Sequence, residues 1–281
     1  MKIRLEKNAY GKNAINLSKI IRHHDHHEFR QISVSVSLQG VFDTAHTEGD
    51  NSKILPTDTQ KNTVYALAKE NFTSGIEDFG ISLSGHFKKN NPQVSKVSIE
   101  ILEHLYRRMH FDGMEHSHAY VSRGNEKHTA LIEEDANGIT VTSGIRDLLI
   151  LKTTDSAFKD YIRDEYTTLK ETDDRILATN CEATWTYNTI NLDFTNQYEV
   201  VRENLLRTFA FHKSLSVQHT LYAMGEELLK KNESIKQISL VMPNKHHILF
   251  NLGQFGMENH NEIFIATDEP FGYITGTVMR E

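Results

Sequence analysis

The sequence lacks most of the features that mark secreted, membrane-bound and nucleic-acid-binding proteins. Its one cysteine, Cys181, excludes an intrachain disulfide and fits a reducing compartment. No apolar run approaches the roughly 20 residues that span a bilayer, and the first residues lack a signal-peptide core. Acidic residues outnumber basic ones by 38 to 31, and the net charge of −7 argues against a nucleic-acid partner. The C-terminal residues also lack the Ser-Lys-Leu peroxisomal signal, so these absences together predict a cytoplasmic protein without a membrane partner.

The composition that remains is that of an ordinary globular chain. With 281 residues, 38% of them hydrophobic and 25% charged, the chain suits one large domain or two of roughly 140 residues. Residues 29–42 alternate between apolar and polar side chains, which predicts a strand buried on one face. Such strands are typical of antiparallel sheets.

The predicted strands and helices follow one order twice. The first half reads strand, strand, helix, helix, strand, strand, over residues 10–22, 29–42, 57–71, 76–89, 94–109 and 117–134. The second half repeats this order over residues 138–152, 174–188, 194–212, 215–231, 235–251 and 262–279. We therefore expect an α+β fold made by duplication, with repeats at 1–136 and 137–281. Because no linker rich in Pro, Gly or Ser separates the repeats, they should form one continuous sheet with helices on one face.

The chain is organised around residues 56–71, PTDTQKNTVYALAKEN. Pro56, Thr57 and Asp58 are residue types that open a helix, and we expect Thr57 or Asp58 to cap it. Three apolar residues of this helix share one face while three polar residues fall elsewhere, namely Val64, Leu67 and Ala68 against Gln60, Lys61 and Glu70. A helix start offers free backbone N–H groups to an anion. The same residue types also begin helices that bind no ligand, so this pattern alone does not establish an anion site.

The wording around this helix start resembles a known family. DNSKILPTDTQKNTVYALAK is similar to the segment of urate oxidases that carries their catalytic threonine. Five more segments resemble that family in matching order and spacing, namely YGK at 10–12, DSAFKDYIRDEYTTLKE at 155–171, DDRILAT at 173–179, SVQHTLY at 216–222 and PNKHH at 243–247. Each segment is too short to identify a family alone. Together, the six segments extend the resemblance over nearly the whole chain.

The resemblance assigns roles to individual residues of this sequence. It implies a proton relay of three side chains, Lys12, Thr57 and His246. It also implies a set of residues that bind the substrate, namely Thr57, Asp58, Phe158, Arg175, Val217, Gln218 and Asn244. Within that set, Phe158 would stack on a purine and Arg175 would hold its edge. Lys12 must shed its proton to act as a base, which a dry interface would favour.

The resemblance further implies a fold, an assembly and a reaction. Urate oxidases have the tunnelling fold, in which two ββααββ repeats per chain form a sheet that closes into a barrel by oligomerisation. For this chain the resemblance implies a homotetramer with active sites between subunits. The implied reaction is the oxidation of urate by O2 to 5-hydroxyisourate and H2O2, and it requires no cofactor because the urate dianion itself reduces oxygen.

Two other functions fit the same fold. One is another tunnelling-fold enzyme that acts on pterins or purines, but a zinc-dependent member would need a His and Cys ligand set and Cys181 has no evident partner. The other is a binding or scaffold protein that has lost catalysis. Taken one at a time, the site residues also have structural explanations: Lys12 as a solvated charge, Phe158 and Val217 as core, and Arg175 paired with a neighbouring aspartate.

The 16 histidines raise the question of a metal site. HHDHH at residues 23–27 is rich in ligand types, and His116 and His118 form a second small cluster. A zinc site needs about four converging ligands, whereas five consecutive loop residues mostly point apart. We therefore expect HHDHH to be a hairpin turn and expect no metal in the mechanism. Only the family register distinguishes His246 from its neighbour His247.

Overall fold

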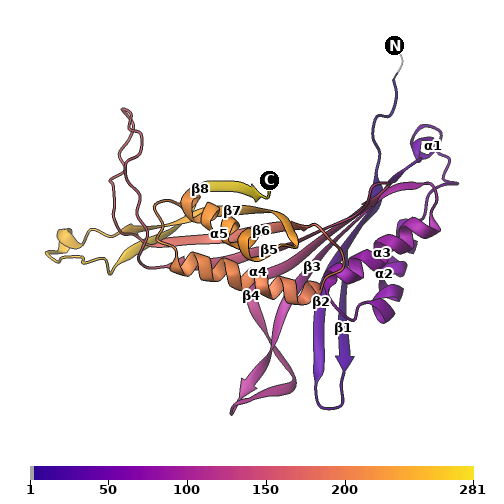
Figure 1. Ribbon diagram of the computed structural model, residues 1–281, viewed down its shortest axis with the longest axis horizontal. Helices are drawn as coiled ribbons and strands as arrows, with labels where there is room; N and C mark the ends of the chain where they lie inside the picture. Colours follow the sequence, from indigo (N-terminus) through magenta and orange to yellow (C-terminus); the bar gives the residue numbers. More distant parts are fainter. Residues whose placement is uncertain (1–2) are drawn as a thin grey trace. The chain divides into compact units, whose positions relative to one another are not determined.

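The computed structural model describes residues 3–281 and contains eight strands, ordered β1 to β8 in one sheet (Figure 1). The first six main elements are β1 (Tyr10–Arg22), β2 (His27–Gly40), α2 (Thr57–Asn71), α3 (Ile76–Asn90), β3 (Val94–Phe111) and β4 (Met114–Asp135). The next six are β5 (Gly138–Lys152), β6 (Leu177–Tyr187), α4 (Phe194–Phe211), α5 (Val217–Lys231), β7 (Ile235–Leu249) and β8 (Phe264–Met279). The repeated order confirms the α+β fold. Two short helices were not expected, α1 (Asp43–Thr47) and η1 (Leu252–Phe255).

The chain packs as two compact units. Unit 1 comprises the residues up to 144 together with 186–198, and unit 2 comprises residues 145–185 and 199–281. These units group residues by their contacts and not by the repeated order of elements. The predicted repeat boundary near residue 136 therefore stays a prediction. No helix among residues 3–281 is both long and apolar enough to cross a membrane.

In unit 1, the alternation of β2 buries one face of the sheet. Four of its side chains are at most 1% exposed: Ile32, Val34, Val36 and Leu38. Helix α2 packs on β1, and α3 packs on β3 and β4 (Figure 1). Phe79, Leu83 and Phe87 of α3 are fully buried, as their helical spacing predicts. Unit 2 uses the same arrangement, with α5 lying against β7 and β8.

The structure corrects the prediction for α2 at two points. Gln60 is fully buried rather than exposed, because it lies one turn before Val64 and two turns before Ala68 on the same face. The N-cap is Pro56, and no side chain caps the helix start. Thr57 is therefore the first helical residue, and its hydroxyl is not used as a cap.

Unit 1 also contains a buried cluster of charged side chains that joins α3 to the sheet. The Nε2 atom of His128 on β4 lies 2.9 Å from Oε1 of Glu77 on α3, and its Nδ1 atom lies 3.7 Å from Oε2 of Glu103 on β3. Arg30 on β2 donates to Glu103 through Nε at 2.7 Å. Ser143 donates its hydroxyl proton to Glu77. Each buried carboxylate thus has positive or protic partners, which offset the cost of burial.

The partners of this cluster shift its pKa values strongly. Burial disfavours charged His128, but the negative charge of Glu77 and the hydrogen bonds to Glu103 and Glu77 outweigh it and raise the pKa of His128 to about 9. Burial likewise disfavours ionised Glu103, yet hydrogen bonds from His128 and Arg30 lower its pKa to about 2. The cluster is therefore charged across the neutral range.

These pKa values predict how stability depends on pH. A raised pKa means that charged His128 stabilises the fold fully below its unfolded pKa near 6.5, and that this contribution disappears as the pH rises through about 9. His128→Gln should lower the free energy of unfolding by about 3–5 kcal/mol at pH 6. Thermal denaturation at several pH values should show this deficit shrinking towards pH 9.5.

Exposed His110 on β3 provides the matched control. His110→Gln should leave the melting temperature nearly unchanged at every pH. If the deficit of His128→Gln were the same at pH 6 and at pH 9.5, the charge on His128 would not be what stabilises the cluster.

Candidate active site

Lys12 is half-buried in β1 beside an irregularity of the strand. Lys12 pairs with Val36 and Ile15 pairs with Val34, so three steps along β1 face two steps along β2. The extra residue forms a bulge in which Ala14 has φ of 53°, and its N–H donates to Ser35 Oγ at 3.2 Å. Such bulges re-aim side chains, here next to Lys12.

Gly11 allows the close approach of the two strands beside Lys12. A Cβ atom on Gly11 would lie 1.8 Å from the carbonyl oxygen of Val36, which no side chain could accommodate. The glycine of the YGK motif is therefore required by the close contact of the two strands. The backbone contact of Gly11 fixes where Lys12 leaves the strand.

Tyr10 connects this strand to the start of α2. The N–H of Leu55 donates to the hydroxyl oxygen of Tyr10 at 2.8 Å. Buried Gln60 donates from Nε2 to the carbonyl of Leu55 at 3.2 Å, so Leu55 is held from both sides. Leu55 lies two residues before Thr57, so these bonds hold the segment that leads into α2.

The first turn of α2 presents Thr57 and Asp58. Thr57 is half-buried, whereas Asp58 is exposed and accepts from Lys61 at 2.5 Å and from Asn62 at 3.1 Å. The pKa of Asp58 is lowered, chiefly by the hydrogen bond from Lys61 and to a smaller degree by the charge of Lys12. Three predicted site residues, Lys12, Thr57 and Asp58, therefore all belong to unit 1.

Unit 2 contains a pocket of about 460 Å3, a size typical of small-molecule sites. Four predicted site residues line it, namely Phe158, Arg175, Asn244 and His246. Apolar and polar side chains that the sequence did not single out complete the wall, among them Ile176, Leu249 and Phe264. Residues more than 80 positions apart in the chain therefore share one cavity.

The segment around Phe158 is held by its backbone. Phe158 and Thr172 form an antiparallel bridge, with N–H···O distances of 2.9 and 3.1 Å. Ala157 donates its N–H to the carbonyl of Ser214 at 2.8 Å. Because Ser214 lies just before α5, this bond ties Phe158 to the helix start that carries Val217 and Gln218.

Arg175 is a partly buried cation with a guanidinium nitrogen that has no hydrogen-bond partner among the described residues. Its central carbon lies 5.1 Å from the centre of the Phe158 ring, a cation–π distance. Its Nε atom is buried and has no hydrogen-bond partner among the described residues, and burial lowers the pKa of the guanidinium. The neighbouring aspartates are engaged elsewhere, because Asp173 pairs with Lys159 and Asp174 accepts from Thr154. The structure therefore does not support a surface ion pair as the role of Arg175.

Asn244 and His246 lie on β7 next to a second strand irregularity. The register with β8 shifts between these two residues, where Asn244 pairs with Gly272 and His246 with Thr267. The Asn244 amide nitrogen lies 3.4 Å from Nδ1 of His246. His247 also lines the pocket, so the cavity by itself does not separate the two histidines.

Val217 and Gln218 form the first turn of α5 but differ in exposure. The Val217 side chain is buried at 3% exposure, so only its main chain can meet a ligand, whereas Gln218 is exposed. Ser216 caps the helix by accepting from the His219 N–H. The N–H groups of the first residues have no acceptor within the helix, which suits an anion.

Two tyrosines that the sequence did not single out contact these clusters, Tyr10 and Tyr161. Tyr10 belongs to the quoted YGK motif, but nothing in one sequence indicates its bond to Leu55. Tyr161 stacks on Phe158 with ring centres 4.9 Å apart and an interplanar angle of 16°. Its place three residues after Phe158 was the available signal, although a loop has no fixed period that would bring the rings together.

The bond between Tyr10 and Leu55 leads to a specific prediction. Tyr10→Phe removes the acceptor for the Leu55 N–H while keeping the edge-to-face packing on Phe42. A lost hydrogen bond of about 1 kcal/mol corresponds to roughly a five-fold loss in turnover if it positions Thr57. Steady-state kinetics should show that loss in kcat. Tyr65→Phe, which removes a hydroxyl bonded to Asn16 from an exposed ring, should keep wild-type kcat. Unchanged kcat in Tyr10→Phe would contradict the positioning role.

Comparison with known proteins identifies the family. A uricase family model matches residues 8–133 and 141–275. The chain is 40% identical to the uricase of Arthrobacter globiformis over 280 residues, which is 100% of this chain and 91% of that protein. It is 36% identical to the uricase of Cyberlindnera jadinii, covering 100% and 98% of the two chains. The crystal structure of the Arthrobacter globiformis uricase matches with a TM-score of 0.95 at 40% identity over 100% of this chain and 96% of that one. Since these matches span almost every residue that carries the two clusters, the chain belongs to the uricase family.

Proposed function

We propose that this chain oxidises urate with O2 to 5-hydroxyisourate and H2O2 in purine degradation, and that it does so in the cytoplasm without a metal or organic cofactor. Membership of the uricase family assigns urate oxidation to the chain. The observation that carries the proposed mechanism is the unit 2 pocket, in which a partly buried arginine with an unpartnered Nε lies beside an aromatic ring.

Urate is a planar anion, and the pocket offers matching contacts. Phe158 would stack on the purine for roughly 0.5–1.5 kcal/mol, and Arg175 would add a charged hydrogen bond of roughly 1.5–3 kcal/mol. Gln218 has both a donor and an acceptor, which suits the lactam edge of a purine. The Val217 N–H at the start of α5 would bind a carbonyl or ring nitrogen. Tyr161 already stacks on Phe158, so urate would take the other face of the ring or displace Tyr161.

The proton relay would combine residues from both clusters. Lys12 takes a proton from urate through the Thr57 hydroxyl, which no helix cap occupies. The resulting dianion donates electrons to O2, and Asn244 with His246 holds the oxygen species and then the attacking water. O2 accepts the electron pair and two protons and leaves as H2O2, and water adds at C5 of the oxidised purine to give 5-hydroxyisourate. Asp58 and the α2 start would meet the edge of urate opposite Arg175.

The two clusters belong to different units, and we propose that two copies of the chain complete each site. Lys12, Thr57 and Asp58 of one copy would face Phe158 and Arg175 of another. Support comes from the strand order, which ends at β1 and β8 and leaves each with one unpaired edge. Strand β8 also exposes large apolar side chains, with Phe271 at 46% and Tyr273 at 67%. A homotetramer that pairs these edges would cover both.

Oxygen uptake tests the reaction directly. Protein treated exhaustively with a chelator should consume O2 in step with the loss of urate's ultraviolet absorption. Urate binding without oxygen uptake would indicate a protein that has lost catalysis. Activity that disappears with the chelator and returns with a metal would overturn the cofactor-independent mechanism.

Kinetics of two variants test the division of labour. Lys12→Met should lower kcat at least 100-fold with little change in KM, because a base contributes mainly in the transition state. Arg175→Ala should chiefly raise KM, by roughly ten-fold or more. Arg163→Ala is a matched control, since Arg163 also lies over an aromatic ring but is exposed and outside the pocket lining. If both site variants lowered kcat and raised KM to the same extent, the assignment of Lys12 to proton transfer and of Arg175 to binding would be rejected.

Mixing inactive subunits tests the shared site. Lys12→Ala and Arg175→Ala chains, dissociated and reassembled together, should recover up to about a quarter of wild-type activity, because one site in four receives both intact residues. Each variant reassembled alone serves as the control. Mixed tetramers of verified composition that stay inactive would place the whole site within one copy.

A further inference from the structure

The turn between β1 and β2 brings together side chains that the sequence places in a run. Strand β1 ends at Arg22 and β2 begins at His27, and the His23 N–H donates to the carbonyl of His26 at 2.9 Å to close the turn. The rings of His23 and His26 stack with centres 4.5 Å apart at 19°. Although consecutive loop residues mostly diverge, this turn makes two of them converge.

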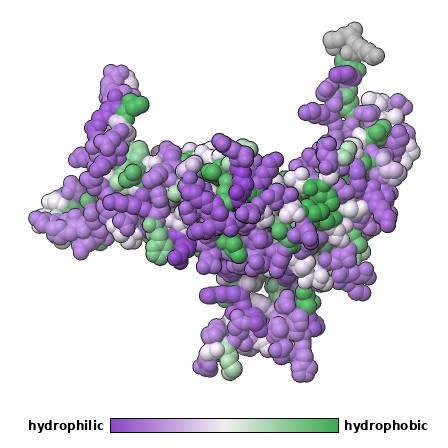
Figure 2. Space-filling view, viewed as in Figure 1, coloured by the Kyte–Doolittle hydropathy of each residue, from purple (hydrophilic) through white to green (hydrophobic). Residues whose placement is uncertain are grey.

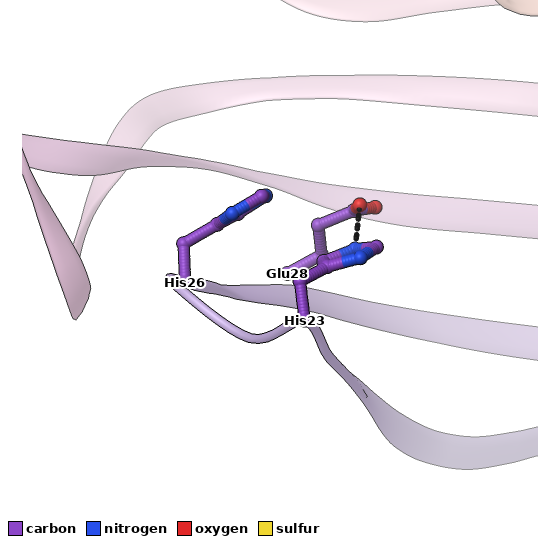
Figure 3. Close-up of side chains that lie close together, drawn as sticks. All are labelled: His23, His26 and Glu28. Atoms are coloured by element: carbon purple, nitrogen blue, oxygen red, sulfur yellow. Dashed lines mark hydrogen bonds and ion pairs between the residues drawn. The ribbon is translucent and has the colours of Figure 1, made fainter.

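Glu28 joins the two histidines on the same side of the hairpin (Figure 3). One ligand atom from each of His23, His26 and Glu28 lies within 4.8 Å of the others. A tetrahedral zinc ion with bonds of about 2.0–2.1 Å separates its ligands by about 3.4 Å. The side chains are 39%, 29% and 49% exposed, so small rotations can close this difference.

A fourth residue orients one of the ligands. Nδ1 of His26 lies 2.8 Å from Oδ1 of Asp25, and a carboxylate only accepts, so Nδ1 carries the proton. The lone pair of His26 is therefore on Nε2, the atom left for a metal. A carboxylate behind a histidine ligand is the usual arrangement around protein-bound zinc.

We propose that His23, His26 and Glu28 form a binding site for one divalent transition-metal ion of the zinc type, with water as the fourth ligand. His23 Nε2 lies 2.5 Å from Glu28 Oε1, so these two ligand atoms already face each other where the ion would bind. Two imidazoles and one carboxylate form a known zinc ligand set with an open position.

This site is separate from the residues proposed for urate. About 11 residues of extended chain lie between Lys12 and His23, which corresponds to roughly 35 Å along the hairpin. The hairpin ends of unit 1 form the mostly hydrophilic protrusion at the bottom of Figure 2, so an ion can reach them from solvent. The proposal therefore predicts metal binding without a change in urate oxidation.

Calorimetric titration of Zn2+ into chelator-treated, untagged tetramer at pH 7.5 tests the site. Wild-type chain should bind one Zn2+ tightly, and His23→Ala or His26→Ala should weaken that binding at least 100-fold. Asp25→Asn should weaken it roughly ten- to 100-fold, as expected for a residue that orients a ligand.

His24→Ala is the matched control, because His24 is exposed in the same turn but outside the converging group. It should bind Zn2+ like the wild type. Equal weakening in His24→Ala and His26→Ala, or no difference between wild type and the His23→Ala/His26→Ala double variant, would overturn the proposal. Urate oxidation should be the same with and without Zn2+, so failure of the metal site and failure of the enzyme function are distinguishable.

Discussion

The residues of the candidate site depend on backbone pairing between long antiparallel strands that bury a single face. A slip of one residue would turn the apolar side chains of β2 to solvent, so the register is strongly fixed. Against that fixed register, the bulge at Ala14 and the shift between Asn244 and His246 are local departures. Both lie next to predicted site residues, where the side chains must leave the regular alternation.

Helix starts are the second part of the proposed site. The starts of α2 and α5 present Thr57 and Val217, and the backbone N–H groups there are the positive ends of helix dipoles. Both starts are fixed by contacts outside the helix, α2 through Tyr10 and Leu55 and α5 through the segment bound to Ser214. In the proposed site, where α2 of one copy would face α5 of another, a planar anion would meet donors on opposite edges.

Two buried cations, His128 and Arg175, differ in how far neighbouring groups compensate their charge. His128 in unit 1 is buried between the carboxylates of Glu77 and Glu103, which compensate its charge and stabilise the packing of α3 on the sheet. Arg175 in unit 2 is partly buried with an unpartnered Nε, which costs stability unless a ligand is bound. Compensated charge indicates architecture, whereas uncompensated charge in a pocket indicates a place for a substrate.

The sequence by itself determined the order of strands and helices, the buried face of strands with clear alternation such as β2, and the family motifs, because periodicity and short motifs are local properties. Tertiary structure alone decided that Gln60 is buried, that Pro56 is the N-cap, and that Phe158, Arg175, Asn244 and His246 share one pocket. The convergence of His23 with His26 likewise depends on a turn geometry that composition does not encode. Strand register, bulges and long-range hydrogen bonds join residues far apart in the chain, and no local pattern contains that information.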